Sequence, residues 1–79
     1  MATMATCVLM FKNGNNQYVR IPDYYDRYEW NEDDGFFSLF GLKMKYNYDT
    51  KEDEVYQRTR LARVRMKAIN GYFFETDDD

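Results

Sequence analysis

Acidic and aromatic side chains are interleaved in residues 23–35. Six carboxylates and a single arginine give this segment a local net charge of −5. Carboxylates spaced along a rigid face can imitate the phosphates of a nucleic acid, and Tyr and Trp are enriched at binding hot spots. The segment predicts a partner-binding surface, although a solvated loop with its tyrosines tucked against a sheet is the plainer interpretation. The predicted surface consists of Asp23, Tyr24, Tyr25, Asp26, Tyr28, Glu29, Trp30, Glu32, Asp33 and Asp34.

Basic side chains gather in residues 58–67, with no acid between them and a local net charge of +5. Such residues can contact phosphates while exposed rings stack on bases, which predicts an alternative nucleic-acid-binding surface. Two observations argue against it: the whole chain carries −3, and on a helix the five charges would spread around the cylinder. They could instead neutralise acidic segments within the fold or across a homodimer. The residues concerned are Arg58, Arg60, Arg63, Arg65 and Lys67.

The chain lacks the usual groups for catalysis. It has no histidine, which removes the commonest general base and a common metal ligand. Cys7 is the only cysteine, so a thiolate zinc site is excluded, and Ser38 is the only serine and has no nearby base in sequence. The four glycines are scattered and build no phosphate-binding loop. We therefore expect no enzyme, no metal and no cofactor.

Length and composition indicate one small domain. Seventy-nine residues with 8 Tyr, 6 Phe and 1 Trp carry more aromatic surface than so thin a core can hide. We expect a single domain over residues 1–79, with frayed ends at 1–5 and 76–79. Without a membrane span, a signal peptide or a possible disulfide, the chain is expected in a reducing cytoplasm, with Cys7 buried in an apolar run.

The first half of the chain predicts strands and turns. Residues 6–12 and 17–21 flank Asn13-Gly14-Asn15-Asn16 and predict a hairpin. A four-residue loop that pairs Phe11 with Tyr18 is favoured over a two-residue turn, because apolar residues then face each other.

Pro22 ends the second strand and favours a short helix over residues 23–30, with an irregular aromatic loop as the alternative. The composition of residues 31–35 predicts a turn. Residues 36–40 form an apolar run, and Gly41 after it predicts a bulge. Residues 42–49 alternate as a half-buried strand.

Two patterns compete between Asp49 and Gly71. Acids at 52–54, Lys67 near the end and Gly71 beyond it agree with a helix and its dipole. Alternation of apolar and basic residues over 62–68 agrees instead with a strand that turns at Asn70-Gly71. We favour the helix. The expected fold class is α+β, a small antiparallel sheet of three to five strands with an N-terminal hairpin and one main helix at about 50–70, and all-β is the alternative. Residues 72–75 are expected to form a last strand or a docked tail.

These features together resemble the general character of small phage-type viral proteins: short, acidic, aromatic and without cofactor apparatus. The sequence therefore predicts a non-catalytic inhibitor that blocks a host protein or ribonucleoprotein complex in nucleic-acid processing or defence, by nucleic-acid mimicry. Alternatives are a nucleic-acid-binding or regulatory module and a small oligomeric assembly subunit.

Overall fold

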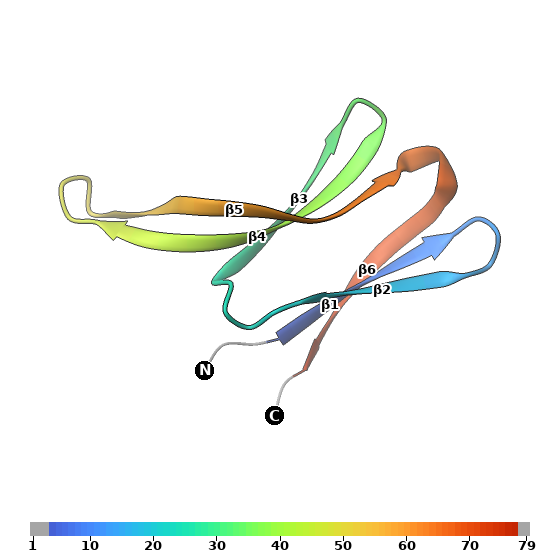
Figure 1. The fold of residues 1–79 in the computed structure, drawn as a ribbon, viewed down its shortest axis with the longest axis horizontal. Coiled ribbons are helices and arrows are strands. Elements are labelled where there is room, and N and C mark those ends of the chain that lie inside the picture. The colour runs from blue at the N-terminus through green and yellow to red at the C-terminus, as the bar shows by residue number, and fades with distance from the viewer. Residues whose placement is uncertain (1–3, 78–79) are drawn as a thin grey trace.

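The protein folds into two three-stranded antiparallel sheets, of order β2-β1-β6 and β3-β4-β5 (Figure 1). The computed structural model describes residues 4–77. Residues 4, 5, 76 and 77, which were expected to fray, belong to strands, and the rest of both predicted frayed ends lies outside the described residues. The elements are β1 Met4–Phe11, β2 Asn16–Ile21, β3 Arg27–Asp33, β4 Phe36–Asn47, β5 Glu52–Arg65, the 3₁₀ helix η1 Met66–Ala68, and β6 Ile69–Asp77.

The predicted helix at residues 50–70 is wrong, and the α+β fold class with it, because this segment is mainly strand β5. β5 pairs with β4 from Asn47 opposite Glu52 to Phe36 opposite Arg65. The acids that suggested a helix start lie beside polar residues of β4, where Asn47 Nδ2 donates to Glu54 Oε1 at 3.0 Å. Helix signals are weak local preferences, and a long partner strand outweighs them. The all-β alternative is correct.

The last strand follows η1 rather than a turn at Asn70-Gly71. β6 pairs with β1 and not with β5, so the first and last strands of the described chain lie side by side. The expectation of a final strand at 72–75 is confirmed.

The N-terminal hairpin is confirmed, but both predicted registers are wrong. Cys7 lies opposite Val19, and the turn needs three residues. Phe11 N donates to Asn15 O at 2.8 Å and Gly14 N to Phe11 O at 3.0 Å, with Gly14 at φ +91°. Glycine occupies this left-handed conformation without steric cost. The resulting register turns the side chain of Cys7 toward the core together with that of Val19.

Residues 23–26 form a turn, so the predicted helix over 23–30 is also wrong. Pro22 ends β2 as predicted, and its carbonyl accepts a hydrogen bond from Tyr25 N at 3.2 Å. The Tyr25 ring lies on Gly41, where a Cβ would stand 2.7 Å from the ring carbons. Gly41 thus permits close packing rather than forming the predicted bulge. The β4–β5 register shifts on either side of it, after Leu39 and after Lys43.

The core lies between the two sheets. Leu9 of β1 and Leu39 of β4 are fully buried at its centre. Cys7 is also fully buried, as predicted, and desolvation raises the pKa of its thiol to about 11. A thiol in this setting acts as a small apolar side chain and not as a nucleophile.

Aromatic rings close the core where β3 faces β6. Trp30 stands 4.4 Å from Tyr72 and 5.5 Å from Phe37 between ring centroids. Tyr28 stacks on Phe74 at 4.5 Å. We call these five residues the ring seam.

The β4–β5 hairpin projects beyond the rest of the molecule (Figure 1). We call its outer part, residues 43–57, the arm. The radius of gyration is 14.4 Å, against about 12 Å for a compact domain of this length. Asn47 orders the tip: its Oδ1 accepts from Asp49 N at 2.9 Å, and its carbonyl from Lys51 N at 2.7 Å. No helix among the described residues is long and apolar enough to cross a membrane.

Candidate nucleic-acid interface

The four arginines of β5 lie on one face of their sheet. Each stands opposite an even-numbered residue of β4, so all four side chains leave the sheet on the same side, away from the core. The spacing 58, 60, 63, 65 would break strand alternation, but the register shift after Leu39 leaves Leu61 as an extra residue and restores it. The four pairs are Arg58 with Leu42, Arg60 with Phe40, Arg63 with Ser38, and Arg65 with Phe36.

Two phenylalanines of β4 support these cations. The Arg58 guanidinium carbon lies 4.1 Å from the centroid of the Phe40 ring, and that of Arg63 lies 3.9 Å from the centroid of Phe36. Arg65 approaches the same Phe36 ring at 5.7 Å. Stacking holds a guanidinium in one orientation while its N–H groups, which lie in the guanidinium plane, stay available. We call these four arginines with Phe36 and Phe40 the arginine face.

Carboxylates neutralise part of this side of the sheet. Glu29 of β3 is ion-paired with Arg58 and also accepts from Asn31 Nδ2 at 2.9 Å. Asp53 lies 3.6 Å from Arg27. Among the described residues, no ion pair joins a carboxylate to Arg60, Arg63 or Arg65. Five arginines and three carboxylates stand opposite the even-numbered residues of β4, a local net charge of +2 in a chain of net −3: Arg27, Arg58, Arg60, Arg63, Arg65, Glu29, Asp33 and Asp53.

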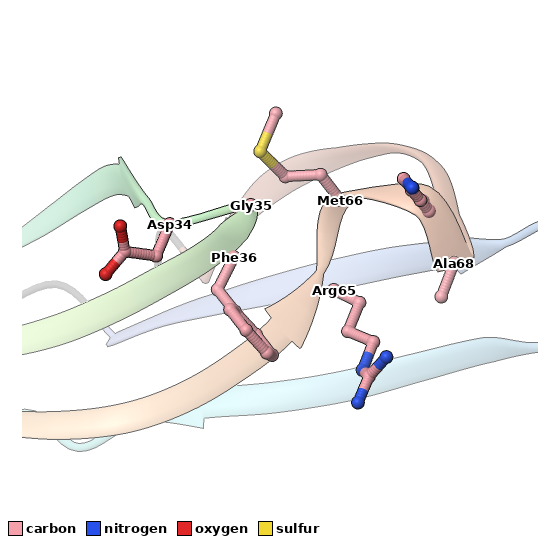
Figure 2. Close-up of a pocket in the computed structure, with 7 residues that line it drawn as sticks. Asp34, Gly35, Phe36, Arg65, Met66 and Ala68 are labelled. Carbon is pink, nitrogen blue, oxygen red and sulfur yellow. The ribbon is translucent and has the colours of Figure 1, made fainter.

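A pocket of about 640 Å³ lies at the Arg65 end of the arginine face (Figure 2). Phe36 and Arg65 line it from the sheet, Asp34 from the β3–β4 turn, and Lys67 from η1. Met66 N donates to Gly35 O at 3.0 Å, which ties the turn to η1 and fixes the pocket walls relative to each other.

The fold does not gather the predicted acidic and aromatic surface. Asp23 and Tyr24 are exposed in the turn after β2, whereas Tyr25 keeps only 8% of its surface exposed. Asp26 Oδ2 accepts a hydrogen bond from Met44 N at 2.9 Å, so this carboxylate is bound to the backbone of β4.

The later members of that set divide between two faces and a turn. Tyr28 and Trp30 point into the ring seam, and Glu32 shares their side of β3. Glu29 and Asp33 lie on the side of the arginine face, and Asp34 is in the turn at φ +51°.

Sequence reasoning missed Phe36, Phe40 and the pocket. The arginine spacing held the one usable signal, because a change from even to odd positions within a basic strand indicates a bulge. The ring contacts and the pocket depend on which strand lies beside β5, and residues 58–67 hold no information about that.

The described residues contain no group of three or more His, Cys, Asp or Glu side chains placed to hold a metal ion. No family model matches the chain, and neither the curated proteins nor the solved structures include a match.

Proposed function

We propose that this protein is a non-catalytic binding protein that holds a short single-stranded nucleic acid along the arginine face. The alignment of four arginines on one side of β5, two of them stacked on phenylalanine, carries the proposal. Proteins that bind single strands combine cations that follow the backbone with planar groups on which bases stack. Arginine planes can serve as stacking surfaces for unpaired bases as well as phosphate ligands.

The dimensions of the arginine face suit a few nucleotides. Arg58 and Arg65 stand opposite Leu42 and Phe36, six residues apart on β4, so they span about 20 Å at the usual rise of a strand, and neighbouring arginines stand about 6.7 Å apart. That spacing is close to the separation of phosphates in an extended single strand. A duplex is a poorer fit, because its bases are already stacked and because the projecting arm has Asp49 and the acids of residues 52–54 near its tip.

A salt titration tests the proposal. Fluorescence anisotropy would compare labelled ten-nucleotide poly-dT and poly-U with a ten-base-pair duplex and a polyglutamate peptide. Three arginines without carboxylate partners predict a slope of log K against log salt of about −2, or a roughly 20-fold loss of affinity between 50 and 200 mM salt. The single strands should bind best. Absent single-strand binding, or equally tight binding of polyglutamate, would overturn the proposal, and the latter would indicate an acidic protein partner.

The arm favours a second candidate, the protein-binding inhibitor expected from the sequence. Tyr48 is 84% exposed and Tyr56 60%, and Tyr46 stands 4.9 Å from Tyr48 between ring centroids. Exposed tyrosines on an ordered ribbon are suited to a protein interface. Capture from a bacterial lysate would test this candidate by comparing the unmodified chain with a Tyr46→Ser/Tyr48→Ser/Tyr56→Ser variant. A protein recovered only by the unmodified chain supports it, and identical recoveries exclude it.

A further inference from the structure

The pocket at the end of the arginine face combines groups that a phosphate site would not need. Arg65 and Lys67 suit an anion, but Asp34 would repel one. Phe36 adds a flat apolar wall, whereas the side chain of Met66 points away from Phe36 and Arg65 (Figure 2). In Figure 2, Asp34 and Arg65 lie on opposite sides of Phe36, with the Asp34 carboxylate turned away from the ring. Asp34 is exposed, so rotation of its side chain can bring the carboxylate toward a ligand on Phe36. This arrangement suits a flat ligand that has hydrogen-bond donors at one edge and acceptors at another.

Nucleobases differ in the hydrogen-bond donors and acceptors that they present to a carboxylate and a guanidinium. A carboxylate pairs best with two adjacent donors, and guanine presents them at N1–H and the 2-amino group. A guanidinium pairs best with two adjacent acceptors, and guanine presents them at O6 and N7. Adenine, cytosine and uracil each lack at least one of these pairs. Guanine is therefore the base whose edges match both Asp34 and Arg65.

We propose that this pocket binds one guanine base at the end of the strand held by the arginine face, an inference that rests on the proposed function. Asp34 accepts from the Watson–Crick edge of the base, Arg65 donates to O6 and N7, and Lys67 contacts the adjoining phosphate. The base packs against the Phe36 ring. The hydrogen bond between Met66 N and Gly35 O keeps the pocket formed before the base arrives.

Because the pocket lies at one end of the arginine face, its preference for guanine should depend on the position of the guanine in the strand. A guanine at one terminus of the strand should increase affinity, whereas a guanine in the middle should not, because the arginines contact the backbone there. The better terminus also reports the direction in which the strand runs along β5.

The experiment uses anisotropy with the full chain and nine-nucleotide poly-dT probes. One probe is unmodified, and the others carry a single guanine, adenine or hypoxanthine at the 5′ end, the 3′ end or the centre. The expected result is an affinity about fivefold to tenfold higher for terminal guanine at one end only. Hypoxanthine lacks the 2-amino group and should lose most of this gain.

Asp34→Asn should abolish the guanine preference while leaving poly-dT binding intact or slightly stronger. Asparagine tolerates the left-handed backbone of this turn, so the fold should survive. Asp49→Asn, in the β4–β5 turn, removes the same charge away from the pocket and should retain the preference.

Two failures can be told apart. If poly-dT binds but terminal guanine and adenine bind equally, or if Asp34→Asn keeps the preference, the guanine pocket is wrong and the proposed function stands. If no probe binds, both are wrong.

Discussion

The acidic segment, residues 23–34, and the basic segment, residues 58–67, have local net charges of equal size and opposite sign, yet the fold treats them differently. The first four carboxylates recur every third residue, a spacing that sends successive side chains to opposite faces once the chain becomes a strand. The arginines recur every second residue with one skip, and the bulge at Leu61 absorbs the skip. A net charge of equal size therefore yields a dispersed segment in one case and an ordered surface in the other.

The two segments also differ in what their large side chains do. Tyr25, Tyr28 and Trp30 of the acidic segment pack into the core or the ring seam, so this segment mainly stabilises the fold. The basic segment keeps its cations exposed, and Arg58, Arg63 and Arg65 contact phenylalanine rings of β4. The comparison predicts that substitutions in the first segment change stability and that substitutions in the second change binding.

Trp30→Ala should have the largest effect, a loss of about 3 kcal/mol in the free energy of unfolding, because it removes the ring that contacts Phe37, Tyr72 and Phe74. Urea denaturation measures it. Trp30→Phe is the control and should cost less than about 1 kcal/mol, since it keeps a ring and removes an indole N–H that has no hydrogen-bond partner among the described residues. Equal stability of Trp30→Ala and the unmodified chain would place Trp30 on a binding surface after all.

Gly41→Ala should destabilise the fold by about 1–3 kcal/mol, because the new methyl group would stand 2.7 Å from the Tyr25 ring. The same urea experiment applies. The double variant with Tyr25→Ala should lose less than the sum of the two single losses, because the clash is then absent. Strict additivity would show that Tyr25 does not rest on Gly41.

Arg63→Ala should weaken single-strand binding about fivefold and reduce the size of the salt slope by about 0.7, with little change in stability. Arg63 stacks on Phe36 and has no ion pair with a described carboxylate, so its charge is available. Lys45→Ala is the matched control: it removes the same charge from an exposed position of β4 that points to the other side of the sheet. A similar loss in both variants would mean that only overall charge matters.

Glu29→Gln should have the smallest effect and the opposite sign. Removing the carboxylate releases Arg58 for a phosphate, so affinity should rise about threefold and the salt slope should steepen by about 0.7. The two side chains of the lost ion pair are 46% and 40% exposed, and its loss should cost less than about 1 kcal/mol of stability. Weaker binding in this variant would show that Glu29 positions Arg58 rather than competing for it.

Local chemistry was enough to predict several features of this protein. The N-terminal hairpin without its register, the end of β2 at Pro22, the strand after residue 42 as far as Asn47, the burial of Cys7 and the final strand all follow from side-chain type and near neighbours. The candidate arginines were also found from spacing and charge. These features depend on turn chemistry, apolar runs and alternation, which act over a few residues.

Contacts between distant segments decided the rest. Residues 50–70 carried both helical and strand patterns, and pairing with β4 selected the strand. Pairing also set the bulge, and the bulge put four arginines on one face over Phe36 and Phe40. The pocket needed the β3–β4 turn and η1 to meet across 30 residues of chain, from Gly35 to Met66. A local sequence pattern does not specify which strand will lie beside it. The sequence alone therefore identified the charged groups, and the tertiary structure determined which of them lie together.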